Sequence, residues 1–397
     1  MSQEQRTQST LSLSMLWFGA SISIAEILTG ALLAPLGMSQ GFTAILIGHA
    51  IGLSILALAG FVGALSGLST AQALVISFGK NGSRFFSSLN IIQLVGWASV
   101  MTITGAKVLN GLTFTLAGYQ NEALWCLGIG ALNLVWVLLG LKHIFKVNII
   151  VVSSLFLTSL VLGHTVFSDT GGVQAISDTL NFGAAVELNV AMALSWLPLI
   201  SDYTRNLKRP VSGTVSCVLC YGLGSTLMFT IGLGAAIYAG TTDLGQILLA
   251  AGFGVFALVV IIFSTLTTTF MDTYSVGVNA SIMYGRMGAK AYGALTCLAA
   301  TSIALLVPMS QYENFLYLIG SVFAPLFAIL LTEFFLYGRR DAESLFRRGN
   351  FLIWLAGFVA YRLLIDYSGI IGNTLPVMLG TAVLCWSVNK VSARAKA

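Results

Sequence analysis

Long apolar runs separated by short polar segments make up almost the whole chain. A transmembrane helix needs about 20 largely apolar residues, and runs near this length recur from one end of the sequence to the other. We predict twelve membrane-spanning helices, at residues 12–37, 41–66, 85–115, 122–141, 148–168, 187–203, 213–240, 247–275, 289–308, 314–338, 350–367 and 369–390. The first run lacks the basic segment and small-residue cleavage site of a signal peptide, so we expect it to be a mature helix. The predicted fold class is an all-α integral membrane protein.

Two of these spans are interrupted by residues that disfavour a continuous helix. Span one reads "LWFGASISIAEILTGALLAPLG" and span six reads "NVAMALSWLPLISDYTR", with Pro198 just after Trp196. Gly-Ala-Ser alone usually marks close helix packing, but two interruptions five spans apart are typical of a five-plus-five inverted-repeat transporter. We therefore expect a first repeat at 12–168, a second at 187–338, and two additional C-terminal helices at 350–390.

The composition excludes a water-soluble globule. Of the 397 residues, 57% are apolar and 8% are charged, and the mean hydropathy is +0.90. Soluble domains carry about 25% charged residues, so this chain has too little polar surface to cover itself in water.

The basic residues predict the orientation of the spans. With twelve spans, all but Lys107 and Arg362 of the 19 basic residues fall at one membrane face, whereas loop carboxylates such as Asp243 and Glu313 fall at the other. Lysine and arginine concentrate in cytoplasmic loops, so we expect both termini in the cytoplasm. The net charge of +5 then reflects topology and requires no nucleic-acid partner.

Charges inside the spans need separate explanations. We expect Lys107, Arg362 and Glu333 to be paired or snorkelling structural charges. His49 is expected to be a buried hydrogen-bonding residue rather than a metal ligand. Cys217 and Cys220 form a lone C-x-x-C with no second ligand pair, which indicates packing rather than a metal site. Hydrolase and nucleotide-binding motifs are also absent, which disfavours an enzyme.

Span eight carries a polar stripe at helical spacing. Ser264, Thr267, Thr268, Asp272 and Ser275 share one face of a helix. A single membrane threonine usually bonds back to its own helix, but a stripe that ends in a carboxylate favours an ion or substrate site. An aspartate at the bilayer centre costs about 2.5–3.5 kcal/mol on the insertion scale, so Asp272 is a functional candidate. Glu26 in span one carries the same argument more weakly.

Aromatic and amide side chains suggest what the site binds. Gln93 and Trp97 are one turn apart in span three, about a dozen residues from its start, and Trp196 lies at the break of span six. Two deep indoles suggest a stacking slot for a flat ring, with Gln93 bonding its edge and Asp272 and Glu26 as acceptors. No arginine is among the candidates, which disfavours phosphate or carboxylate substrates. A nucleobase or an aminopyrimidine suits this inventory, whereas a channel would need a continuous polar pore.

At these residues the chain resembles the nucleobase–cation symporter family, which has the leucine-transporter-like fold. The resemblance rests on "LWFGASISI" in span one, "GW" in span three, "SDYTR" after span six and "TTTFMDTYS" in span eight. Within the family, bacterial hydroxymethylpyrimidine transporters are the closest likeness, and cytosine permeases are next. The resemblance implies a monomeric secondary transporter of the bacterial cytoplasmic (inner) membrane, with no cofactor.

The resemblance also implies roles for individual residues. Trp97 and Trp196 would sandwich a pyrimidine ring whose edge bonds Ser195, Ser23 and Gln93. A sodium ion would be bound by the residues at the first break and on span eight, namely Gly19, Ile22, Ser264, Thr267 and Thr268, with the register among 264–269 open by one residue. Asp272 stands where relatives carry an asparagine, and Glu26 where they are apolar. These departures favour hydroxymethylpyrimidine, the amine-bearing thiamine precursor, over cytosine, and they leave a proton as the alternative coupling ion.

Overall fold

A computed structural model describes residues 6–139, 144–168, 179–242, 246–247, 255–339, 344–367 and 369–394. All regular structure in these residues is helical, apart from an isolated bridge between Gln8 and Leu207. The all-α fold class is confirmed.

The helices have the following bounds. The α-helices are α1 Thr10–Ser21, α2 Ile24–Leu32, α3 Gly37–Ser66, α4 Thr70–Ala117, α5 Glu122–Leu139, α6 Ile144–Ser168, α7 Phe182–Leu194, α8 Leu197–Thr204, α9 Pro210–Ala239, α11 Val255–Tyr284, α12 Ala289–Leu306, α13 Tyr312–Leu331, α14 Arg348–Leu364 and α15 Thr374–Arg394. Short 3-10 segments are η2 Ala34–Leu36, η3 Met309–Gln311 and η5 Ile365–Tyr367, and η4 Thr332–Leu336 is a π-helical turn.

These helices group into membrane crossings. Ten stretches in the described part of the chain are long and apolar enough to cross a membrane. One of them, Ile24–Ser66, joins α2 and α3 through η2 and contributes to two crossings, and α11 is a further 30-residue helix. Pairing α1 with α2 and α7 with α8 as halves of broken spans gives the twelve crossings predicted.

Both expected breaks are present. α1 ends before Ile22 (φ −84°, ψ 82°) and Ser23 (φ −141°, ψ 156°), whose dihedral angles are not helical. In span six, α7 ends at Leu194 and α8 begins at Leu197, with Pro198 in its first turn. A proline is tolerated there because the first turn has no intrahelical acceptor for its missing N–H.

The broken span one packs tightly against α9. A Cβ atom at Gly30 would lie 2.2 Å from the Phe229 carbonyl oxygen, and one at Gly232 would lie 2.0 Å from the Ile27 carbonyl oxygen. Such distances leave no room for a side chain, so these two glycines allow the backbones of α2 and α9 to touch.

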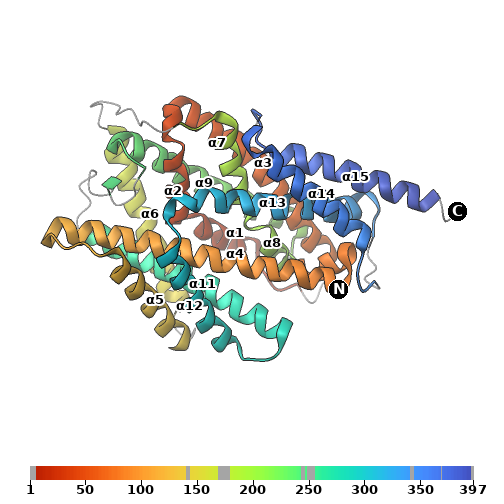
Figure 1. Cartoon of the computed structure of the whole chain (residues 1–397), viewed down its shortest axis with the longest axis horizontal. Coiled ribbons are helices and arrows are strands. Elements are labelled where there is room, and N and C mark those ends of the chain that lie inside the picture. The colour runs from red at the N-terminus through yellow and green to blue at the C-terminus, as the bar shows by residue number, and fades with distance from the viewer. Residues whose placement is uncertain are drawn as a thin grey trace.

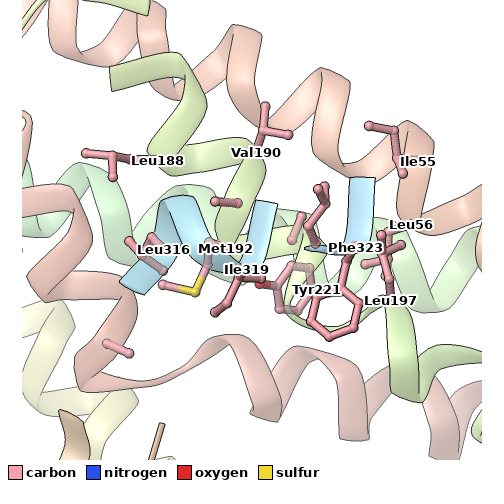
Figure 2. Packing of buried hydrophobic residues seen from close by; sticks show 14 of the residues in the cluster. Ile55, Leu56, Leu188, Val190, Met192, Leu197, Tyr221, Leu316, Ile319 and Phe323 are labelled. Atoms are coloured by element: carbon pink, nitrogen blue, oxygen red, sulfur yellow. The ribbon is translucent and has the colours of Figure 1, made fainter. Parts of the chain in front are cut away.

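The centre of the molecule is closely packed around α7. Every residue of α7 from Gly183 to Leu194 is buried. Figure 2 shows Met192 of α7 beside Ile319 of α13, in the cluster that also contains Leu188, Val190 and Tyr221. A helix that is buried on all faces must lie inside the bundle. In Figure 1, α5, α11 and α12 gather on one side of this core and α14 and α15 on the other.

The third span differs from the sequence prediction. α4 begins at Thr70 rather than at residue 85, and it changes direction at Gly79 (φ 74°, ψ 174°). A Cβ at Gly79 would lie 2.7 Å from the Leu345 carbonyl carbon, and Lys80 N donates to the Ser344 carbonyl oxygen. The predicted boundary was wrong because the polar stretch from Gly79 to Arg84 lies inside α4, at its change of direction, rather than before the helix.

Basic residues cluster where the termini lie. Figure 1 shows both termini at the same end of the molecule. Arg6 donates to carbonyl oxygens of Leu207 and Ala64, and Arg347 forms an ion pair with Glu333 at 2.8 Å. Arg339 is a second ion-pair partner of Glu333, at 2.5 Å. Glu333 is therefore a paired structural charge, as expected.

Candidate functional site

The break in span six is joined directly to α4. Gln93 Nε2 donates to the Ser195 carbonyl oxygen at 2.8 Å and to Asn90 Oδ1 at 3.1 Å. Gln93 Oε1 is buried and has no hydrogen-bond partner among the described residues. The Ser195 hydroxyl donates to the Met192 carbonyl oxygen at 2.7 Å. Two predicted substrate residues thus meet where the backbone leaves the helix, and an amide acceptor there is open to a ligand donor.

The two predicted stacking tryptophans lie in separate aromatic clusters. Trp97 is edge-on to Phe315 of α13 at 5.3 Å and to Tyr312 at 6.1 Å, measured between ring centroids. Trp196 is edge-on to Trp17 of α1 at 5.4 Å and to Tyr221 at 6.2 Å. Each ring is therefore held by edges rather than by a face-to-face partner. No ring contact between Trp97 and Trp196 is present among the described residues.

Asp272 lies on the side of α11 that faces α4. A Cβ at Gly105 of α4 would lie 2.9 Å from Thr265 Cγ2, and Tyr284 Oη lies 2.7 Å from the Ser88 hydroxyl. The first contact joins the N-terminal half of α11 to the C-terminal half of α4, and the second joins the C-terminal end of α11 to the N-terminal half of α4. The two helices therefore run antiparallel. Asp272 is seven residues after Thr265, and Trp97 is eight residues before Gly105, so the two side chains are at similar depth.

The surroundings of Asp272 supply no partner. Its side chain is partly buried and forms no hydrogen bond with any residue the structure describes. Asn279, almost two turns further along the same face, lines a cavity together with Asn90. Asp272 is therefore a partly buried carboxylate on the face that leads from this cavity toward Trp97. Span eight was predicted to end at residue 275, whereas α11 continues to Tyr284.

The span-eight hydroxyls divide into two groups. Thr267, Thr269 and Thr273 donate to carbonyl oxygens of their own helix, at 2.7–3.0 Å. The hydroxyls of Ser264 and Thr268 form no hydrogen bond with described residues, and the two positions are one turn apart. This pair remains open to bind an ion, whereas the hydroxyl hydrogen of Thr267 is already engaged and only its lone pairs are free.

The first break presents backbone groups and a cap. Ile22 N donates to the Gly19 carbonyl oxygen at 3.2 Å, and the Ser23 hydroxyl accepts from Glu26 N at 3.4 Å as the N-cap of α2. The Glu26 carboxyl group points to α9, where Tyr221 and Ser225 bond its two oxygens. Ser23 is thus engaged in capping, and Glu26 faces α9 through both of its oxygens.

Two cavities flank the predicted site along α4. One, of about 230 Å³, is lined by Thr104 and Lys107 of α4 and by Tyr312 of α13. The other, of about 110 Å³, is lined by Asn90 of α4 and by Asp202 of α8. Gln93 and Trp97 lie between these levels of α4, so the candidate site separates a cavity at each end of the molecule. We call them the outer cavity and the terminal-side cavity, respectively.

The remaining span charges have mixed surroundings. Lys107 lines the outer cavity, and Arg362 lies on an exposed face of α14. His49 is a buried hydrogen-bonding residue, as expected.

Sequence reasoning missed Glu187. Its side chain is 0% exposed, and it accepts hydrogen bonds from the Tyr361 hydroxyl, the Thr374 hydroxyl and the backbone N–H groups of Asn373 and Thr374. It therefore caps the N-terminus of α15 and fastens α14 and α15 to α7. Glu187 is the first residue of predicted span six. A carboxylate at the end of a span is usually exposed to solvent, so its sequence position did not indicate that it is buried.

Trp17 was also missed. It is 1% exposed and packs edge-on against Trp196, Tyr203 and Tyr221. A tryptophan at the start of an apolar run suggests an interfacial position, and only the fold places it beside the break of span six.

Comparisons with known proteins agree on one class. A family model described as permeases for cytosine/purines, uracil, thiamine and allantoin matches residues 1–351. The cytosine permease of Escherichia coli K12 is 25% identical over 355 residues, which cover 87% of this chain and 82% of that one. The purine-cytosine permease FCY2 of Saccharomyces cerevisiae is 25% identical over 377 residues, covering 85% and 69%.

A solved structure shares the fold. The inward-facing conformation of Mhp1 superposes with a TM-score of 0.78 at 18% identity, covering 98% of this chain and 92% of that one. At this identity the likeness shows the fold, and it confirms the architecture expected from the two broken spans. The relatives are permeases, which agrees with the expectation that the chain is not an enzyme.

Proposed function

Because the chain belongs to the family of permeases for cytosine/purines, uracil, thiamine and allantoin, we propose that it imports a small planar nitrogen heterocycle together with a cation. One observation carries this proposal. The Gln93–Ser195 junction lies between the outer cavity and the terminal-side cavity. A transporter that works by alternating access needs one walled site that can open to either side in turn.

The proposed substrate is hydroxymethylpyrimidine, with cytosine as the second candidate. Trp97 and Trp196 would stack on the ring, and Gln93, Ser195 and Ser23 would bond its edge. Asp272 would accept a hydrogen bond from the exocyclic amine, because it has no partner among the described residues. Cytosine remains the second candidate because a cytosine permease is 25% identical to this chain.

The proposed coupling ion is sodium. The Ser264 and Thr268 hydroxyls have no hydrogen-bond partner in the described part of the chain, and Thr267 has free lone pairs. Together with carbonyl oxygens of Gly19 and Ile22, they form the oxygen set that a small hard cation prefers. One positive charge that moves inward gains about 2.3 kcal/mol per 100 mV, which supports roughly fifty-fold accumulation of substrate.

The two halves of the fold would perform the movement. We assign residues 12–168 and 187–338 to the two inverted repeats, with residues 350–390 as an accessory pair of helices. The Glu187 contacts described above would keep that pair attached to α7 throughout the cycle.

A thermal-shift panel tests the substrate and the ion together. The purified protein is heated with hydroxymethylpyrimidine, cytosine, uracil and adenine, with and without sodium. We expect hydroxymethylpyrimidine to give the largest stabilisation, and we expect sodium to increase it. A larger shift with cytosine would transfer the assignment to that base. Stabilisation by none of these rings would refute the proposed substrate class.

Counterflow in proteoliposomes then tests the mechanism. Labelled substrate should accumulate transiently when unlabelled substrate is preloaded inside, because a carrier exchanges one molecule for another. Flux without saturation or counterflow would indicate a channel instead.

A further inference from the structure

A second buried polar network lies apart from the Gln93–Ser195 junction. Glu26 of α2 is 1% exposed, and its Oε2 lies 2.7 Å from the Ser225 hydroxyl of α9. The same hydroxyl lies 2.7 Å from His49 Nε2 of α3, and His49 Nδ1 lies 2.9 Å from the Ile45 carbonyl oxygen. Tyr221 donates to the other oxygen of Glu26 at 2.9 Å. Three helices thus contribute to one continuous chain of hydrogen bonds.

The protons in this chain can be counted. A carbonyl oxygen only accepts hydrogen bonds, so His49 Nδ1 must carry a proton toward Ile45. The Ser225 hydroxyl has one proton and stands between two groups, so it can donate to only one of them. If Glu26 were ionised and His49 neutral, one of the two 2.7 Å contacts would have no proton. The two contacts therefore require one proton more than a network with ionised Glu26 and neutral His49 contains.

Two arrangements with this extra proton satisfy every atom. In the first, neutral Glu26 donates to Ser225 Oγ, and Ser225 donates to His49 Nε2. In the second, protonated His49 donates to Ser225 Oγ, and Ser225 donates to ionised Glu26. The network passes from the first to the second when the Glu26 proton moves to Ser225 and the Ser225 proton moves to His49. No other bond is made or broken.

The surrounding helices offer no other source of positive charge. Apart from His49, α2, α3, α7, α9, α11 and α13 contain no basic residue. The titratable groups that face the network are Tyr221 of α9 and Tyr312 of α13, whose hydroxyl bonds Thr29 one turn after Glu26. The Asn189 side chain of α7 also lies beside the imidazole. Asp272 of α11, Glu187 of α7 and Glu313 of α13 are the other carboxylates of these helices, whereas both oxygens of Glu26 are bonded by hydroxyl groups of α9.

The network touches both the candidate site and the outer cavity. The Tyr221 ring packs against Trp196 at 6.2 Å between centroids, while its hydroxyl holds Glu26. Tyr312, which bonds the next turn of α2, lines the outer cavity. A change of protonation at Glu26 is therefore transmitted through Tyr221 to the residue proposed to stack on the substrate.

We propose that Glu26, Ser225 and His49 form a proton-binding relay that takes up one proton from the outer side and releases it as the transport cycle proceeds. The transport part of this inference rests on the proposed function, whereas the binding of the proton does not. It gives Glu26 a role other than the substrate acceptor suggested by its place in the sequence. The cation bound here is a proton, which would be coupled to transport in addition to the sodium ion, and its site is separate from the residues assigned to sodium.

The proton itself is detected without any substrate. Infrared difference spectra of the purified protein are recorded between acidic and alkaline pH, and the carboxylic-acid C=O band is followed. We expect a band that disappears in Glu26→Gln and shifts in Ser225→Ala, because the alanine removes the hydroxyl that accepts from the acid. His49→Gln, which bonds but takes no proton, should change the pH at which the band titrates. Asp272→Asn is the matched control and should leave this band in place.

Each result decides the proposal. A band that survives Glu26→Gln, or no titrating carboxyl band in the wild-type protein, would overturn it. If Glu26→Gln fails to fold, the Ser225→Ala shift and the His49→Gln change must still appear, and an unchanged spectrum in both variants refutes the relay.

The link to transport is tested in proteoliposomes. An inward proton gradient should stimulate pyrimidine uptake by the wild-type protein, and His49→Gln should abolish that stimulation while substrate binding changes by about twofold or less. If no pyrimidine is transported at all, the infrared result still decides whether the relay holds a proton. If uptake occurs and the gradient acts equally on wild type and His49→Gln, the relay does not couple.

Discussion

The Asp272→Asn substitution tests whether this carboxylate recognises the substrate amine by a hydrogen bond or has another role. Asparagine keeps the size of the side chain and one acceptor oxygen, but it removes the charge. A hydrogen bond to a charged group contributes about 1.5–3 kcal/mol. At about 1.4 kcal/mol for each factor of ten, affinity for an aminopyrimidine should fall by roughly 10- to 150-fold. Affinity for the same ring without its amine should change by about twofold or less, since no donor is lost.

The structure adds a second expected effect of this substitution. Asp272 has no hydrogen-bond partner among the described residues, and a lone aspartate at this depth costs about 2.5–3.5 kcal/mol. Asp272→Asn should therefore raise the thermal midpoint of the substrate-free protein. A structural carboxylate that was paired would have the opposite effect.

Binding is measured with both ligands on the purified protein, with Thr273→Val as the matched control. Thr273 is the next residue of α11, but its hydroxyl donates to carbonyl oxygens of its own helix. The control should leave the ratio of the two affinities unchanged. Equal loss of both ligands in Asp272→Asn would refute the amine-reading role, and a lower thermal midpoint would show that the carboxylate is needed for folding.

Four further variants test other parts of the structure. Trp97→Ala should abolish pyrimidine uptake while expression stays intact, and near-normal uptake would refute stacking. Replacing Thr267 and Thr268 together by alanine should remove sodium-dependent stabilisation in the thermal-shift assay, and a retained sodium response would place the ion elsewhere. Glu187→Gln should destabilise the protein by about 1–3 kcal/mol, because an amide NH2 replaces one acceptor oxygen and leaves buried donors without a partner. Gly30→Ala should lower the thermal midpoint, because its Cβ would lie 2.2 Å from a carbonyl oxygen of α9. Unchanged midpoints in the last two variants would contradict the described packing.

The sequence was sufficient where a local signal forces the structure. Apolar runs of membrane length have no alternative to helices, since lipid offers no partner for a free backbone group. Pro198 and the Gly-Ala-Ser segment before Ile22 marked the two breaks, and both are present. The start of α4 could not be predicted this way. The polar stretch from Gly79 to Arg84 separates its first turns from the apolar run. They join α4 through Gly79, which meets the segment that contains Leu345, a contact between distant parts of the chain.

The sequence predicted which residue types form the candidate site, but it did not predict which neighbouring helix each side chain faces. Gln93 of span three and Ser195 at the break of span six meet, and both had been predicted to bond the substrate. Glu26 shares the broken span with the proposed sodium ligands, yet its carboxyl group turns to α9. Helical periodicity defines which residues share a face, but it does not say which neighbour that face meets. That information comes only from how α2 and α9 pack.

Three buried or partly buried carboxylates show how the fold assigns different tasks to one functional group. Glu187 accepts hydrogen bonds from several donors, two of them backbone N–H groups at the start of α15, so it suits a permanent attachment. Glu26 faces hydroxyl groups and, through Ser225, an imidazole, so it can exchange a proton without leaving an unpaired atom. Asp272 has neither kind of partner among the described residues. We therefore propose that the bound substrate supplies the missing partner of Asp272, and that Asp272, rather than Glu26 or Glu187, is the residue whose substitution should best identify the substrate.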